Sequence, residues 1–293
     1  MVVSKYFVFF IFYSFLGWIY ESCYCTIQHH YWQNRGFLYG PIVPIYGVGA
    51  TAAQILFNDL PIDRLHNMTN LQIFFICAAG SFVMEYITSF TLEKLFHARW
   101  WDYSKMPLNI NGRVCLIFTA CFGLAGVVIV NFLIPPLAGL GSGIHPLIYE
   151  IVSLIFMLIF GMDLALTVSA LTTFGKEFER INEQINQQIA DKYTALETNL
   201  AERKINGIEK YEAGREARFV KMELTAEKLT ELKEQLSLEY VKQTINNATE
   251  TQRGQLRHIT KFVHPVASTN RLMEKGSLLL KGKKSDSSDE ESN

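Results

Sequence analysis

Five long apolar runs fill the first 174 residues of the chain, and a charge-rich helical pattern follows them. A helix needs roughly 20 apolar residues to cross the hydrocarbon core of a bilayer. Each run therefore predicts a transmembrane helix, although the second run is short and has two prolines near its start. The runs cover about residues 2–24, 41–57, 71–92, 114–134 and 144–174. We expect an all-α fold, a polytopic helical membrane bundle of about five transmembrane helices.

Charge divides the chain into two parts, although the formal net charge is only −1. Residues 1–174 hold 7 Lys or Arg and 8 Asp or Glu, and the remaining residues hold 20 of each kind. We predict a transmembrane domain at 1–174 and a cytoplasmic helical or coiled-coil tail at 175–275. Residues 276–293 end in SDSSDEESN, which cannot bury a core, so we expect a disordered, charged C-terminus.

The tail repeats apolar residues at helical spacing, with charges of both signs between them. Two groups carry the repeat: Ile181, Ile185, Ile189, Leu196 and Leu200, and then Leu229, Leu232, Leu236 and Tyr240. The repeat weakens at about 206–220, where Gly207 and Gly214 lower helix propensity. A single long helix and a hairpin both fit this pattern. A solvated amphipathic helix and a coiled coil that joins copies of the chain also both fit.

The orientation follows from Lys and Arg in the short loops, which favour the cytoplasmic side. One set of alternate loops carries Arg35, Lys94, Arg99, Lys105 and Arg113, whereas the other carries only Arg64. With five spans, this places the N-terminus outside and the tail in the cytoplasm. We therefore expect a multi-pass protein of the cell membrane with a cytoplasmic tail.

Three carboxylates interrupt the apolar runs, at Glu21, Glu85 and Asp163. A charged side chain in a bilayer is costly unless it faces protein, water or a partner charge. Glu21 ends the first span on the predicted cytoplasmic side, and Glu85 lies in the inner half of the third. Their surroundings therefore bear on function.

Two predicted cytoplasmic loops are unusually rich in polar and turn-forming residues. The first reads QNRGFLYGPIVPIYG and the second RWWDYSKMPLNINGRVC. In the second loop Asp102 is suited to cap a turn, and Asn109, Asn111 and Gly112 favour one. Trp100, Trp101 and Tyr103 suit the headgroup level of a membrane. Together with the acids, the loops define a candidate polar cluster: Glu21, Asn34, Arg35, Glu85, Asp102, Asn109 and Arg113.

Two interpretations of the cluster remain open. It forms a cytoplasm-facing binding cavity, or it is a brace in which Glu21 or Glu85 pairs with Arg35 or Arg113 and holds the helices together. An arginine nearby would keep a buried carboxylate charged, whereas an unpaired one would become neutral.

Four stretches occur in an order that resembles a bacterial membrane-protein family: FLGWIYES, NRGFLYGPIVPIYG, MEYITSFTLEKLFHARWWDYS and PLNINGRVCL. The chain is similar over about residues 6–174 to the family described as putative ABC-transporter type IV, whose members are permease-like. The matching positions are Glu21, Asn34, Arg35, Gly36, Gly40, Pro41, Glu85, Tyr86, Trp101, Asp102, Tyr103, Pro107, Asn109, Gly112 and Arg113. The resemblance implies a permease subunit, and it does not cover the tail.

Several kinds of chemistry have no motif in this sequence. It lacks G-x-x-x-x-G-K-[ST], G-x-S-x-G, H-E-x-x-H and C-x-x-C-H. We therefore expect no enzyme activity, no cofactor, no metal and no nucleic-acid partner. The five cysteines lie in or beside apolar runs without a metal-site spacing.

Two function classes follow from the sequence. The first is an ABC-type permease subunit of unknown substrate, with its ATPase on a separate chain. The second is a membrane scaffold or regulator that acts through the tail, with homo-oligomers formed by the tail as one variant. In both function classes, we expect the lipid bilayer that surrounds the helices to be a partner.

Overall fold

A computed structural model describes residues 2–29, 36–60, 68–205 and 214–290. The chain forms two compact units. The first unit comprises residues 1–171 with His258–Val263, and the second comprises Thr172–Arg257 with residues 264–293. Helices dominate both, and the described strands are only two residues long each. The predicted all-α class is confirmed, and the domain boundary at residue 174 stays a prediction.

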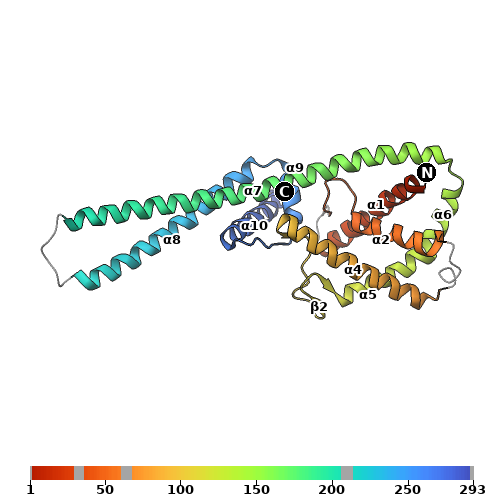
Figure 1. Cartoon of the computed structure of the whole chain (residues 1–293), viewed down its shortest axis with the longest axis horizontal. Helices are drawn as coiled ribbons and strands as arrows, with labels where there is room; N and C mark the ends of the chain where they lie inside the picture. The colour runs from red at the N-terminus through yellow and green to blue at the C-terminus, as the bar shows by residue number, and fades with distance from the viewer. Residues whose placement is uncertain (1, 30–35, 61–67, 206–213, 291–293) are drawn as a thin grey trace. The chain divides into compact units, whose positions relative to one another are not determined.

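The helices of the first unit form a bundle (Figure 1). They are α1 (Val2–His29), α2 (Pro44–Gln54) with η1 (Ile55–Asp59), α4 (Asn70–Phe96), α5 (Leu116–Val128) with η2 (Ile129–Leu133) and α6 (Ile134–Ser142), and the first part of α7 (Pro146–Ile205). Four stretches are long and apolar enough to span a membrane: Val3–Ile27, Asn70–Phe96, Leu116–Gly139 and Pro146–Lys192. The chain is therefore a multi-pass membrane protein.

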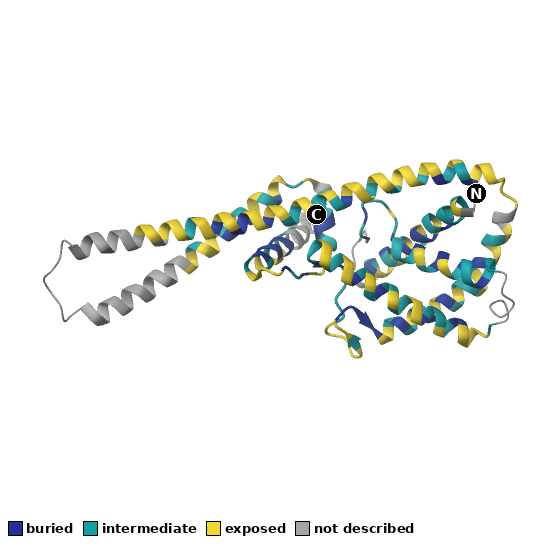
Figure 2. Cartoon of the chain, viewed as in Figure 1, coloured by how far each residue is buried: buried dark blue, intermediate teal, exposed yellow. Residues whose placement is uncertain are grey.

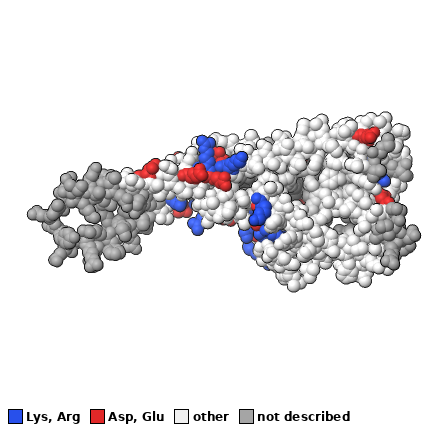
Figure 3. Space-filling model, viewed as in Figure 1, with Lys and Arg blue, Asp and Glu red and all other residues white. Residues whose placement is uncertain are grey.

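The outer surface of these helices is suited to lipid. Figure 2 shows that α4 and α5 carry exposed residues outward and bury residues between them. On the face in Figure 3, the surface of the first unit carries very little charge away from its ends. The α4–α5 contact depends on small residues, because a Cβ atom at Gly123 would lie 2.8 Å from the Phe74 ring. A Cβ at Gly126 would overlap the Cys77 side chain. Such close backbone approach is typical of helix pairs in membranes.

The second predicted span is only partly helical. Its helical part is α2, with 11 residues, and the π-helical η1, with 5. α2 runs antiparallel to α1: the Val43 amide donates to the Ser14 carbonyl at 3.0 Å, and Lys5 Nζ lies 3.6 Å from Asp59. Its first turn therefore lies level with the middle of α1. Residues 36–43, which precede it, have no regular secondary structure. The count of five spans stays a prediction.

Two small antiparallel sheets lie where α4 ends and α5 begins. We refer to this as the inner end, because the loop charges predict that it faces the cytoplasm. β2 (Asn109–Ile110) pairs with β3 (Val114–Cys115), and β1 (Ala98–Arg99) pairs with β4 (Lys261–Phe262). β4 belongs to the tail in sequence and to the first unit in space.

The second unit is a helical hairpin with a third helix packed on it. It contains the rest of α7, then α8 (Gly214–Asn247), most of α9 (Glu250–His258) and α10 (Ala267–Glu290). The Gln188 amide donates to the Tyr240 hydroxyl at 2.8 Å across α7 and α8. The core contains Phe178, Ile181, Ile185, Val241, Ile245 and Met273. The tail is thus a hairpin, and α8 begins at Gly214, one of the two glycines that weakened the repeat. Joining of chain copies through the tail stays a prediction.

The structure differs from the sequence expectation at the C-terminus. α10 passes through residue 276, where we expected disorder to begin. Gly276 and Ser277 are buried, and a Cβ atom on Gly276 would lie 3.0 Å from the Phe178 ring. Because it packs on α7, the start of this segment is part of the helical unit.

Candidate functional site

The second polar loop is an ordered structure at the inner end of the first unit. α4 ends at His97 in the left-handed conformation, with φ 51°. Asp102 Oδ1 then accepts hydrogen bonds from the backbone amide and hydroxyl of Ser104, which is the turn-capping role predicted for it. The β2–β3 hairpin turns at Asn111 and Gly112, with φ values of 53° and 69°. An Asn-Gly pair at positive φ is the preferred hairpin turn.

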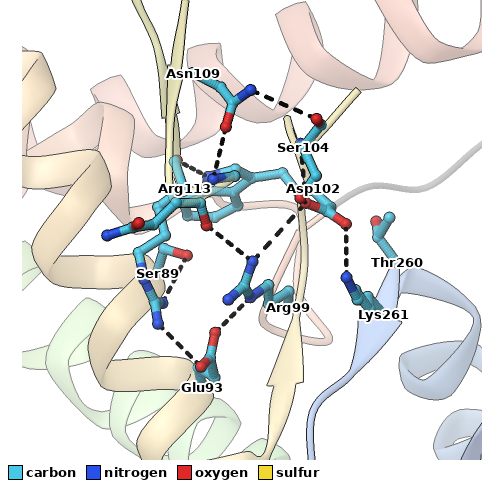
Figure 4. Close-up of polar contacts among 12 residues, drawn as sticks. Ser89, Glu93, Arg99, Asp102, Ser104, Asn109, Arg113, Thr260 and Lys261 are labelled. Carbon is cyan, nitrogen blue, oxygen red and sulfur yellow. Dashed lines mark hydrogen bonds and ion pairs between the residues drawn. The ribbon is translucent and has the colours of Figure 1, made fainter. Parts of the chain in front are cut away.

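Glu93 on α4 holds two arginines together (Figure 4). One oxygen lies 2.9 Å from Arg113 Nη2, and the other accepts a hydrogen bond from Arg99 Nε. Arg113 is buried, and its Nη1 also lies 3.4 Å from the Ser89 hydroxyl. Arg99 Nη1 donates to the Asn111 carbonyl at 3.1 Å. A half-buried carboxylate therefore fixes the loop to the end of the helix through charge-assisted hydrogen bonds.

Asp102 extends this network toward the tail strand. Its carboxylate lies 3.4 Å from Lys261 Nζ and 3.8 Å from Arg99 Nη1. Burial opposes ionisation of Asp102, but the hydrogen bonds from Ser104 and the Lys261 charge outweigh burial and lower its pKa. A Cβ atom at Gly112 would lie 2.6 Å from Asp102 Oδ1, so the hairpin fits against this carboxylate because residue 112 lacks a side chain. We name the inner cluster by its members: Ser89, Glu93, Arg99, Asp102, Arg113 and Lys261.

Asn109 shapes the loop. Its amide nitrogen donates to the Met106 carbonyl at 2.7 Å, and its oxygen accepts from the Gly112 amide at 3.0 Å. The Trp101 indole donates to the Arg113 carbonyl at 2.8 Å. Trp100 is buried, and Trp101 and Tyr103 are half-buried. Trp100 therefore packs inside the protein, whereas the headgroup-level position of Trp101 and Tyr103 stays a prediction.

Glu85 occupies a different environment from Glu93, about two helical turns deeper along α4. Its side chain is only 6 % exposed. One oxygen accepts a long hydrogen bond of 3.4 Å from the Tyr103 hydroxyl. The other, Oε2, makes no hydrogen bond within the part of the chain that the structure describes. Arg113, which we considered as its partner, binds Glu93 instead.

Glu21 lies close enough to Tyr103 to act on it electrostatically. Burial raises the pKa of Tyr103, and the charges of Glu85 and then Glu21 raise it further. Glu21 itself is half-buried on α1. Tyr103 is thus near both acids, and the convergence of the whole polar cluster stays a prediction. Asn34 and Arg35 lie outside the described residues, so a pair between Glu21 and Arg35 stays a prediction.

A strand from the tail joins both inner loops. The Thr260 amide donates to the Arg99 carbonyl at 2.8 Å, and the Thr260 hydroxyl donates to the Trp100 carbonyl at 2.6 Å. The Val263 amide donates to the His97 carbonyl at 2.7 Å. His258 Nδ1 lies 3.0 Å from the Gly36 carbonyl of the first loop. His258–Val263 is thus an integral part of the inner end.

The third intramembrane acid, Asp163, binds the non-helical backbone of the second span. Its two oxygens accept hydrogen bonds from the backbone amides of Tyr39 and Gly40, each at 2.9 Å. At 1.5 Å per residue, Asp163 lies about 25 Å along α7 from Pro146, within the thickness of a bilayer. A Cβ on Gly40 would lie 2.8 Å from Asp163 Oδ2. We call this contact the amide latch.

Sequence reasoning missed several members of these sites. Glu93 lies one helical turn after Ser89 and is close to Arg99 in the sequence. This proximity indicates a contact, but the count of charges in the loops did not consider it. Asp163 was recognised as a costly acid but was not connected to the first loop. Lys261 had no sequence signal, because it lies far along the chain from Asp102. No group of three or more potential metal ligands occurs among the residues that the structure describes.

Comparison with known proteins agrees with the motif resemblance. The family model described as "Putative ABC-transporter type IV" matches residues 8–168. Neither a curated protein nor a solved structure matches the chain. The match covers more than half of the 293 residues, and it includes Glu85, Glu93, Asp163 and both inner loops. The chain therefore belongs to the family described as putative ABC-transporter type IV.

Proposed function

We propose that the chain is the membrane-embedded permease subunit of an ABC-type transporter whose ATPase is a separate chain. The observation that carries the proposal is the amide latch, in which Asp163 holds non-helical backbone at membrane depth. Such backbone is tolerated only where protein or a water-filled cavity covers it. Broken helices of this kind line the substrate pathways of many transporters.

The geometry of the amide latch favours a segment, residues 36–43, that changes conformation during transport. Residues 36–43 lead from the inner end, where Gly36 contacts His258, to the middle of α1, where Val43 contacts Ser14. Between these points the Asp163 carboxylate supplies acceptors for two amides that a helix would otherwise satisfy internally. A segment held by a few side-chain contacts rearranges more easily than a helix does, because fewer backbone bonds must break.

The separate ATPase follows from the sequence, which contains no phosphate-binding loop motif. The inner end supports a docking role, because three segments far apart in sequence are tied together there. These are the first loop, the second loop and His258–Val263. A rigid platform of this kind is suited to transmit a force from a cytoplasmic partner to the helices.

The experiment is purification from native membranes in mild detergent, followed by identification of chains that carry a phosphate-binding loop and by assay of ATP hydrolysis. We expect an ATPase chain in stoichiometric amount. We also expect Asp163→Asn to lower ATP hydrolysis by the complex while Glu150→Gln, on the same helix, leaves it unchanged. Absence of an ATPase chain, or hydrolysis that is indifferent to the latch, would contradict the proposal.

A second candidate is a scaffold or regulator that acts through its tail. The sealed environment of Glu85 favours it, since a substrate cavity would leave that acid accessible to water. The strand His258–Val263 also favours it, because a pull on the tail would reach Arg99 and Trp100 directly. Deleting residues 264–293, which leaves His258–Val263 in place, separates the candidates: a regulator loses its partner response, whereas a permease keeps its ATPase partner.

A further inference from the structure

The β2–β3 hairpin exposes a set of apolar side chains that neither the inner cluster nor the proposed transport function uses. Met106, Leu108 and Ile110 are 37 %, 68 % and 47 % exposed. Figure 1 shows the hairpin of β2 at the edge of the bundle, beside the start of α5. We infer that residues 106–110, the arm that leads into the hairpin turn and that we call the tip of the loop, insert into the headgroup and upper acyl region of the inner leaflet and anchor the loop to lipid.

The tip is held in one conformation despite its exposure. Leu108 has φ 55°, a backbone conformation that is uncommon for a residue other than Gly, Asn or Asp. Its carbonyl accepts from the Leu116 amide at 3.1 Å, and Asn109 binds the Met106 carbonyl. A disordered loop would let apolar side chains turn inward. This one is fixed with Leu108 outward, which favours a structure that meets an apolar environment.

The position of the tip indicates which environment that is. β3 leads directly into α5, whose first residues Leu116 and Ile117 are 55 % and 44 % exposed. α5 begins the candidate membrane span Leu116–Gly139, so these residues face lipid. The exposed side chains of the tip therefore continue an apolar surface that already lies in the bilayer. An interfacial segment typically buries its apolar face about 5–10 Å below the headgroups.

A positive charge beside the tip is also suited to contact with lipid headgroups. Lys105 is exposed immediately before Met106, where its ammonium group can reach lipid phosphates while its stem lies along apolar surface. The inner cluster connects to this hairpin through the Arg99 bond to the Asn111 carbonyl. Lipid contact at the tip would therefore help to position the cluster. The inference does not depend on transport, because a scaffold would need the same anchor.

Site-specific fluorescence quenching tests the inference in the full chain reconstituted in phosphatidylcholine and phosphatidylglycerol vesicles. Leu108→Cys, in a variant whose five native cysteines are replaced, carries an environment-sensitive dye. Phe132→Cys, 75 % exposed in a candidate span, is the lipid-facing control, and Ser104→Cys, exposed on the loop, is the water-facing control. Ile110→Cys is the second probe if the first variant does not fold.

We expect doxyl groups near the headgroup end of lipid chains to quench the dye at residue 108 more than doxyl groups near the methyl end. We also expect iodide in water to quench it about threefold less than at residue 104, given the shallow burial of interfacial segments. Iodide quenching equal to that at residue 104 would overturn the inference.

Discussion

The amide latch and the inner cluster each stabilise a carboxylate in low-polarity surroundings, but with different kinds of partner. At the latch, Asp163 accepts from neutral groups among the described residues: the amides of Tyr39 and Gly40 and, more weakly, the Thr167 hydroxyl. In the inner cluster, Glu93 is surrounded by the guanidinium groups of Arg99 and Arg113. The first arrangement organises backbone that has no helix of its own, and the second locks a loop to a helix end.

The difference suggests distinct roles. Ion pairs in low dielectric are strong when complete and costly when one partner is removed, so the inner cluster is suited to be permanent. Backbone amides can be satisfied in other ways, for example by helix formation, so the latch is suited to be exchanged. Glu85 follows neither pattern, with one long hydrogen bond from Tyr103 and a buried oxygen. It is the acid whose partner or protonation state we expect to change during function.

Glu93→Gln gives the largest expected effect. It leaves Arg99 and the buried Arg113 without their shared carboxylate, which costs about 3 kcal/mol for a buried pair. The melting temperature in detergent should fall markedly, and the double variant with Arg113→Gln should recover part of the loss. Glu177→Gln removes the same charge from an exposed position and should have little effect. A melting temperature unchanged by Glu93→Gln would show that the inner cluster does not stabilise the loop.

Asp163→Asn gives the next largest effect. An amide can accept from one of the two backbone amides but presents a donor to the other, which costs about 2 kcal/mol. We expect lower thermal stability and faster hydrogen exchange confined to residues 36–43. Glu150→Gln on the same helix is the control. Uniformly faster exchange across α7 would argue that Asp163 supports the whole bundle rather than the latch.

Glu85→Gln should change stability by less than about 1 kcal/mol, the size of one hydrogen bond. The substitution breaks no ion pair within the described part of the chain, and Tyr103 can still donate to the amide oxygen. Tyr103→Phe should be similarly mild, since the ring keeps its stack on Phe118. Activity or partner response should nevertheless fall. If Glu85→Gln strongly lowered the melting temperature, this acid would have a strongly stabilising partner, and the contrast with Glu93 would not hold.

The smallest effect is a pH dependence from Asp102. Its pKa is lowered in the folded protein, so the unfolded chain binds the proton more tightly. The stability that Asp102 contributes is therefore complete at neutral pH and is lost as pH falls below about 4. The melting temperature at neutral and acid pH should differ less in Asp102→Asn than in the parent. An equal difference in both proteins would exclude this contribution.

Local pattern determined the helical class, the membrane character and much of the second loop. Long apolar runs can satisfy their backbone in a bilayer only as helices or closed barrels, and runs of about 20 residues fit helices. Asp102, Asn109 and Gly112 were predictable as turn residues because each acts on backbone within a few positions. The same locality explains the burial of Ile181 and Ile185 in the tail hairpin.

Tertiary structure alone decided which charges meet. The pairing of Asp102 with Lys261, and of Asp163 with the Tyr39 and Gly40 amides, joins residues more than a hundred positions apart. Sequence periodicity gives the face of a helix but not its neighbour. The sequence therefore left Arg113 open as a partner of Glu21 or Glu85, and the structure places it beside Glu93. The partial helix of the second span was also decided in three dimensions. Its two prolines and glycines permit non-helical backbone, and the carboxylate of a helix far along the chain satisfies two amides of that backbone.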